Sequence, residues 1–120
     1  MFKPAIFIYF DGSFKNNKGA IGYYIETQGN ELIHKNNKLY PKLKNNTEAE
    51  YKSLEYALIK TKQICGSDNR LFIFGDEKTV LENHTSHNKI NEIIQQFESV
   101  IITQIPSHEN KAHYLANKLL

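Results

Sequence analysis

Two of the chain's three aspartates directly follow apolar segments. Asp11 comes after the β-branched and aromatic run at residues 5–10, and Asp76 comes after residues 71–74 and a glycine. Each has an ordinary alternative explanation, because Asp before Gly is common at turns and Asp is a frequent helix N-cap. Catalytic and ligand-binding side chains gather at the carboxyl ends of strands in sheets with parallel crossovers. Two acids placed this way on neighbouring strands favour a paired-carboxylate site.

A third carboxylate, that of Glu50, is expected to point toward the same site. Residues 47–65 have the periodicity of a helix that ends at Gly66. At 100° per residue, Glu48 and Glu55 are expected to face outward, whereas Glu50 shares the inward arc. A helix N-terminus favours an acid in its first turn, but this does not explain the inward direction. The other residues of this arc are Leu54, Ala57, Leu58, Thr61, Ile64 and Cys65.

Three converging carboxylates repel one another and hold their protons more tightly unless a cation lies among them. A buried carboxylate is costly unless it is paired, capped or bound to a metal. Ligands that are all oxygen select Mg²⁺ or Mn²⁺ over zinc. Two such ions bridged by a shared carboxylate can activate a water and stabilise a leaving oxygen in phosphodiester cleavage. These residues therefore point to metal-dependent phosphoryl chemistry.

The elements that must position these acids alternate in a simple order. We expect strands at 5–10, 20–26, 31–39, 71–74 and 100–105, with turns at 11–13, 14–19 and 28–30. The short apolar strand 71–74 is expected to be buried on both faces. We expect helices at 47–65, 77–84 and 88–98, and from 109 to the C-terminus. The order predicts an α/β fold: a mixed five-stranded sheet, with an antiparallel meander plus parallel strands, flanked by helices.

Composition limits the classes of protein to consider. The chain has 120 residues, 40% of them hydrophobic, with a formal net charge of +2 and one Cys. This length and apolar content suit one domain, residues 1–120, with a real core. A single Cys argues against a disulfide framework and favours a cytoplasmic protein. The N-terminal apolar run is too short to span a bilayer, so no membrane association is expected.

Four lysines lie in a stretch that lacks acidic residues between Leu32 and Thr47: Lys35, Lys38, Lys42 and Lys44. Such a cluster can bind the phosphates of a nucleic acid through counterion release. It can equally be a solvated loop. The sequence leaves both interpretations open.

Four segments, in order along nearly the whole chain, resemble ribonuclease H type 1 domains. Residues 8–13, followed by 19–23, resemble the opening hairpin of that family. Residues 46–54 (Asn-Thr-Glu-Ala-Glu-Tyr-Lys-Ser-Leu) are similar to its first helix, in which the second Glu is a metal ligand. Residues 71–76 resemble its fourth strand, and residues 105–117 resemble its closing segment.

The resemblance implies a ribonuclease H-like fold and an endonuclease that hydrolyses the RNA strand of RNA·DNA hybrids. The products would carry 5′-phosphate and 3′-hydroxyl ends. Asp11 would bridge two ions, Mg²⁺ or Mn²⁺, while Glu50 and Asp76 would each help to hold one. We expect a monomer without an obligate protein partner. Positions that match contacts to the hybrid are Gly12, Ser13, Asn16 or Asn17, Asn46 and Thr47.

The sequence departs from the family's pattern at several positions. Glu77 replaces the family's Ser, and residues 76–100 leave no room for a basic, aromatic helical handle that grips DNA. The fourth carboxylate ligand is replaced by His113 when the segment is aligned from residues 115–117. Aligned from Pro106, the same place falls to Tyr114. We favour His113 as the metal ligand, although it could be a residue at the rim of the last helix.

His108 precedes the last helix, where some members of the family use a flexible His to assist product release. Two alternatives to the ribonuclease remain. The first is a structure-selective DNA nuclease of the resolvase kind, which shares the fold. The second is a catalytically silent nucleic-acid-binding domain, as the altered fourth ligand suggests.

Overall fold

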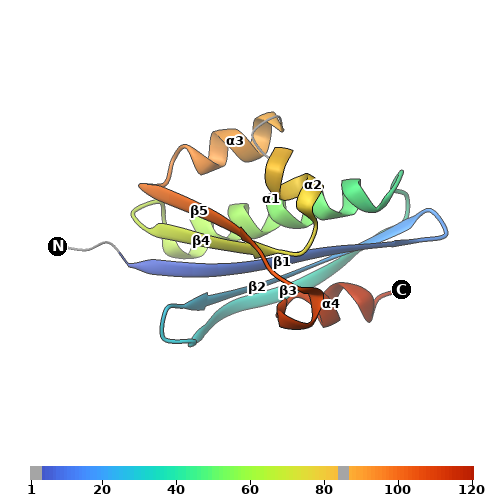
Figure 1. Ribbon diagram of the computed structural model, residues 1–120, viewed down its shortest axis with the longest axis horizontal. Coiled ribbons are helices and arrows are strands. Elements are labelled where there is room, and N and C mark those ends of the chain that lie inside the picture. Colours follow the sequence, from blue (N-terminus) through green and yellow to red (C-terminus); the bar gives the residue numbers. More distant parts are fainter. Residues whose placement is uncertain (1–3, 84–86) are drawn as a thin grey trace.

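The computed structural model describes residues 4–83 and 87–120 as one sheet with helices on both sides (Figure 1). The elements are β1 (Ala5–Lys15), β2 (Lys18–Thr27), β3 (Leu32–Tyr40), α1 (Asn46–Cys65), β4 (Arg70–Gly75), α2 (Lys78–Asn83), α3 (Asn88–Ile94), β5 (Ser99–Gln104), the 3₁₀ helix η2 (Ser107–Glu109) and α4 (His113–Asn117). The sheet order is β3-β2-β1-β4-β5, antiparallel from β3 to β1 and parallel from β1 to β5. The predicted mixed five-stranded α/β sheet is therefore confirmed.

The two faces of the sheet are covered differently. Helices α1, α2 and α3 lie on one face, and α4 packs on the other, mainly against β2 and β1 (Figure 1). Phe72 and Phe74 of β4, on the α4 face, are only partly buried and pack against Phe7 and Tyr9. The prediction that residues 71–74 are buried on both faces is wrong, because α4 covers another part of that face. The core between α1 and the sheet includes Ile8, Phe10, Ile25, Leu54, Leu58 and Ile73.

Strand β1 runs through the expected turn after Asp11. Residues 11–15 pair with residues 18–22 of β2, and the chain reverses at Asn16 and Asn17, whose φ angles are 53° and 65°. Asn tolerates this left-handed conformation, which tight hairpin turns require. The predicted turn at 11–13 is wrong, because Gly12 is held in the ladder by the packing of α1 against it.

Helix α1 begins and ends as its sequence predicts. The Asn45 side chain accepts a hydrogen bond from the Glu48 N–H (2.8 Å), and Gly66 ends the helix with φ of 75°. Two of the predicted orientations are wrong. Ile64 is 49% exposed, whereas Glu55 is buried and pairs with Lys89 of α3 at 3.6 Å, because α3 packs over that side of α1.

None of the described helices, α1 included, is long and apolar enough to cross a membrane.

The last helix is shorter than the one predicted from residue 109 to the C-terminus. The chain forms η2, then adopts an extended conformation at Asn110, and becomes helical again only at His113. The Asn110 side chain donates a hydrogen bond to the Phe10 carbonyl (2.9 Å), which draws the chain out of a continuous helix. Helix α3 likewise ends at Ile94 rather than at 98, and residue 84 of the expected helix 77–84 lies outside the described residues.

Two glycines let helices approach the sheet closely at the same level. A Cβ on Gly12 would lie 2.4 Å from the Ala49 carbonyl carbon of α1. A Cβ on Gly22, which pairs with Asp11, would lie 2.7 Å from the Ala116 amide nitrogen of α4. Both distances are too short for a side chain. The absence of a Cβ at these two positions brings α1 and α4 against the sheet around Asp11.

We expect Gly12→Ala to lower the free energy of unfolding by about 1–3 kcal/mol, since overpacking forces α1 away from β1. The control is Gly29→Ala, where the nearest atom to a new Cβ is the Thr27 hydroxyl at 3.8 Å. Urea denaturation of both variants measures the difference. Equal stability of the two variants would contradict this account of how α1 is seated.

Candidate metal centre

Four side chains meet where β1 and β4 lie side by side. The parallel register ends at the pair of Tyr9 and Phe74, so Asp11 and Asp76 each lie two residues beyond it, on the same face. His113 approaches from the start of α4. Ligand atoms of Asp11, Asp76 and His113 all lie within 4.8 Å of one another. The strand register therefore places the two aspartates close together, as the sequence predicted.

Glu50 reaches Asp11 from α1, on the inward arc expected for it. It is 1% exposed and contacts the Asp11 carboxyl group, while its Oε2 has no hydrogen-bond partner among the described residues. Burial, followed by the negative charge of Asp11, raises the pKa of Glu50 to about 11. In the metal-free protein this carboxyl group therefore keeps its proton at neutral pH.

Asp11 is the central member of the group. It is buried, its Oδ1 accepts a hydrogen bond from the Gly12 N–H at 3.0 Å, and its Oδ2 lies 2.7 Å from the His113 Nδ1. Burial raises the pKa of Asp11, and Asp76 adds to this, while Glu50 and His113 oppose it. A buried carboxylate between two other acids fits a place where a cation would neutralise charge.

His113, rather than Tyr114, is the residue that the chain brings to Asp11. The Tyr114 ring is 49% exposed, and its hydroxyl accepts a hydrogen bond from the Lys35 ammonium at 3.3 Å. His113 and Tyr114 are neighbours in the chain, so their side chains leave the first turn of α4 in different directions. Because α4 begins at His113, it is the His113 side chain that faces Asp11. An imidazole beside three carboxyl groups, one with an unpaired buried oxygen, is a donor set that fits a divalent cation, Mn²⁺ in particular.

Asn110 also belongs to this site, although the sequence analysis assigned no role to it. It is 4% exposed, and its Nδ2 donates to the Phe10 carbonyl at 2.9 Å and to the Asp76 Oδ2 at 3.3 Å. Its Oδ1 accepts a hydrogen bond from the Ala112 N–H at 3.1 Å. One amide thus ties the closing segment to β1 and orients Asp76. An Asn four residues after Pro106 was the available signal, but an Asn in a loop is too common to single out.

Two of the expected substrate-contacting residues lie close to this group. Gly12 is buried in β1 next to Asp11, against the backbone of α1. The Ser13 hydroxyl donates to the Asn117 Oδ1 at 2.9 Å, and the Asn117 side chain in turn contacts His113. The structure therefore connects Ser13 to His113 through a single side chain.

Others lie further away, at the rim. Asn16 and Asn17 are exposed at the β1–β2 turn, and five residues of strand place Asn16 about 16 Å from Asp11. Asn46 and Thr47 occupy the first turn of α1, where Thr47 lines a hollow of about 280 Å³. The exposed His108 lies on η2, between Pro106 and the closing helix.

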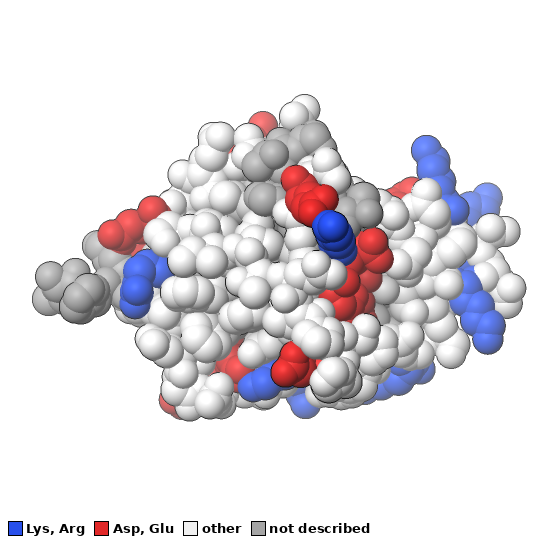
Figure 2. Space-filling view, in the orientation of Figure 1, with Lys and Arg blue, Asp and Glu red and all other residues white. Residues whose placement is uncertain are grey.

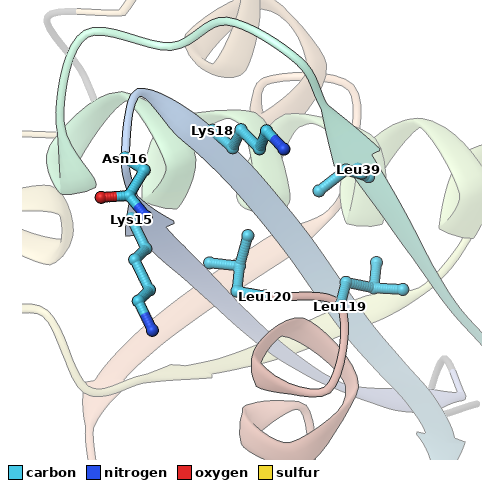
Figure 3. A pocket seen from close by; sticks show the side chains of 6 residues that line it. All are labelled: Lys15, Asn16, Lys18, Leu39, Leu119 and Leu120. Carbon is cyan, nitrogen blue, oxygen red and sulfur yellow. The ribbon is translucent and has the colours of Figure 1, made fainter.

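Asn16 also lines a second hollow, of about 230 Å³, with Lys15, Lys18, Leu39, Leu119 and Leu120 (Figure 3). This hollow joins the hairpin tip to the last residues of the chain. On the face shown in Figure 2, acidic side chains gather near the centre, and basic side chains gather at the end that carries the β1–β2 turn. The acidic and the basic side chains thus occupy separate regions of this face.

Comparison with models of protein families and with curated proteins finds no match, whereas solved structures match over nearly the whole chain. Ribonuclease H1 from the archaeon Halobacterium salinarum has 23% identity and a TM-score of 0.84, covering 95% of this chain and 96% of its own. The N-terminal ribonuclease H domain of a Mycobacterium tuberculosis protein has 19% identity and a TM-score of 0.86, with 96% and 92% covered. LC11-RNase H1 in complex with an RNA/DNA hybrid has 21% identity and a TM-score of 0.83, with 94% of each covered. The chain has the ribonuclease H fold.

In the metal-free protein, we expect Glu50→Gln to raise the melting temperature, and the gain to increase from pH 5 to pH 9. Glu50 has a pKa of about 11 when folded and an ordinary value of 4.5 when unfolded, so the unfolded chain releases a proton that the folded chain retains. Stability of the wild type therefore falls as pH rises between these two values, and Gln removes that loss. Thermal melts with EDTA measure the effect.

Glu48→Gln, a half-buried position in the same turn, serves as the control and should show no such pH-dependent gain. A lower melting temperature for Glu50→Gln at pH 8 would show that the folded protein holds Glu50 as a stabilised carboxylate.

Proposed function

We propose that this protein is a metal-dependent endonuclease that hydrolyses the RNA strand of RNA·DNA hybrids, leaving 5′-phosphate and 3′-hydroxyl ends. The observation that carries the proposal is the meeting of Asp11, Asp76 and His113 within 4.8 Å, next to the buried Glu50, on a ribonuclease H fold. A solved structure of the same fold, LC11-RNase H1, holds an RNA/DNA hybrid. Residues 1–120 would act as one domain, as a monomer in the cytoplasm.

The residues would divide the work as follows. Asp11, which touches both Glu50 and His113, would bridge two ions, with Glu50 and Asp76 each holding one and His113 completing the set. When bound, divalent ions supply Lewis acidity and lower the pKa of a coordinated water. Asn110 keeps the Asp76 carboxylate turned toward Asp11, and the Gly12 N–H holds one Asp11 oxygen in place. Preorganised ligands of this kind reduce the reorganisation needed at the transition state.

Selection of RNA over DNA would depend on polar groups around the centre. Ser13, Asn46 and Thr47 offer hydroxyl and amide groups suited to ribose 2′-hydroxyls, and Asn16 or Asn17 would extend the contact along the strand. Phosphates would be held by lysines of the stretch 35–44, among them Lys42 and Lys44, which line a surface hollow with Asn17. His108, exposed beside the closing segment, would assist product release.

The test is one gel that compares an end-labelled RNA·DNA hybrid with duplex DNA, duplex RNA and a branched junction, each with Mg²⁺ or Mn²⁺. We expect cleavage of the RNA strand of the hybrid only. Asp11→Asn should reduce cleavage below detection while hybrid binding persists, because it removes the bridging charge but keeps the side-chain shape.

Asp68→Asn, which precedes β4 at the opposite end of that strand from Asp76, is the matched control and should cleave like the wild type. Cutting of the junction instead would identify the DNA nuclease of the same fold. Binding without cleavage of any substrate would identify the silent binding domain.

We expect the enzyme to work better with Mn²⁺ than with Mg²⁺ at equal, low concentration. Imidazole removes one negative charge relative to a carboxylate, and Mn²⁺ accepts nitrogen ligands more readily than Mg²⁺. His113→Ala should lower activity at limiting metal at least about tenfold, with partial recovery at high Mn²⁺. His113→Asp should shift the preference toward Mg²⁺. Initial rates across a metal titration provide the measurement.

Tyr114→Phe is the neighbouring control and should leave these rates unchanged. Wild-type rates for His113→Ala at limiting Mg²⁺ would mean that the fourth ligand lies elsewhere.

A further inference from the structure

An ion pair between a buried glutamate and a partly exposed lysine lies on the same face of the sheet as Asp11, outside the group of candidate metal-centre residues. Glu26 of β2 is fully buried, and the Lys111 ammonium contacts its two carboxylate oxygens at 2.5 Å and 2.7 Å. The Lys111 ammonium also lies 5.4 Å from the centre of the Tyr9 ring and 5.5 Å from that of Tyr24. Lys111 is therefore held by a charge at its tip and by an aromatic ring on each of two strands.

The register of the sheet shows how this pair is related to the metal centre. Tyr9 pairs with Tyr24 and Asp11 pairs with Gly22, so all four residues share one face with Glu26. Glu26 lies four residues from Gly22 along β2, which is about 13 Å. The lysine side chain therefore ties the closing segment to a point on the sheet well away from Asp11.

Helix α4 cannot place His113 by its own stability. It has five residues, His113 is the first of them, and its first turn lacks a side-chain cap among the described residues. Isolated helices of this length do not persist in water, so packing and hydrogen bonds must fix where α4 begins. Two anchors precede it directly: Asn110 binds β1 and Asp76, and Lys111 binds β2.

Packing of Leu115 and Ala116 holds the later part of α4, so the two anchors act on the residues that lead into His113. Asn110 fixes the segment at one point, and Lys111, whose ammonium reaches Glu26 on another strand, fixes its direction. With both anchors in place, His113 Nδ1 lies 2.7 Å from Asp11 Oδ2. We propose that Lys111, held by Glu26, is a positioning residue that sets His113 against Asp11, a role that rests on the proposed function of this centre.

A purely structural role makes a different prediction. Replacing a buried ion pair with well-packed apolar residues is often neutral or stabilising for a fold. If Lys111 and Glu26 only stabilise the protein, an apolar replacement that keeps the melting temperature will keep the activity. If they position His113, activity and metal affinity will fall even when the protein remains as stable as the wild type.

The first experiment is Lys111→Met in the full chain, with initial rates on RNA·DNA hybrid across a Mn²⁺ titration. We expect kcat to fall about tenfold or more, and the Mn²⁺ concentration for half-maximal rate to rise by a similar factor, as for other residues that orient metal ligands. KM for the hybrid should stay within about twofold, since Lys111 is tied to Glu26 and not placed at the hybrid. Lys111→Arg should recover most of the rate, and Lys118→Met, an exposed lysine just after α4, should behave like the wild type.

The exchange of charges separates positioning from simple loss of folding. Glu26→Lys and Lys111→Glu should each be destabilising, because each places two like charges in contact, one of them at the buried position 26. The double variant restores the pair in reverse and should recover both the melting temperature and at least part of kcat. Recovery of stability with none of the activity would overturn the proposal.

A readout without cleavage keeps this inference distinct from the proposed function. In the metal-free protein with ¹⁵N-labelled histidine, the His113 Nδ1 signal reports the contact with Asp11. We expect this signal to move in Lys111→Met and to stay unchanged in Lys118→Met, whether or not the wild type cleaves a hybrid. An unchanged His113 signal in Lys111→Met would overturn the positioning role, whereas failure of the wild type to cleave any hybrid would overturn the proposed function alone.

Discussion

The contact between the carboxyl groups of Glu50 and Asp11 is the constraint around which the molecule is arranged. Two acids buried against each other are unfavourable when both are charged, and burial removes the solvent that would screen them. The contact is made because the backbone of α1 lies against Gly12, where a side chain would collide with Ala49. The close seating of a long, well-capped helix on the central strand thus supplies the packing energy that holds an otherwise repulsive pair together.

The second face of the sheet contributes differently. There the helix is short, and its close packing against Gly22 is supplemented by individual polar contacts: Asn110 to the Phe10 carbonyl, Lys111 to Glu26, and the Asn37 side chain to the Leu115 carbonyl at 2.8 Å. One wall of the centre is therefore fixed by the packing of a long helix, and the other by the packing of a short helix together with hydrogen bonds and an ion pair. The two walls also differ in exposure, since Glu50 of α1 is 1% exposed and the side chain of His113 of α4 is 49% exposed.

The parts that could be predicted from sequence are those set by local patterns. Apolar runs that end in Asp located Asp11 and Asp76, and the helical period gave the inward direction of Glu50. The order of strands and helices followed from the same patterns.

The errors arose where contacts between residues distant in sequence decide the local structure. Gly12 stays in a strand because α1 packs on it, and Glu55 is buried because α3 covers it. The choice between His113 and Tyr114 depended on one residue of register, which Asn110 sets through a contact with Phe10, a hundred positions earlier in the chain. The roles of the six expected substrate-contacting residues stay predictions.

The proton that Glu50 retains has a consequence for how the protein matures. Zinc fingers have no stable fold until their metal arrives, because the ligands cannot be gathered without it. Here Glu50, whose pKa is about 11, keeps its proton and is therefore uncharged beside Asp11. The proposed ligands can thus lie together before any ion is present. In the proposed metal-dependent function, folding would come first and loading afterwards, and the binding of a cation by Glu50 would release this one proton to the solvent. Synthesis of the chain would not have to wait for the metal, and a chain that has lost its ions would keep a site ready to be refilled.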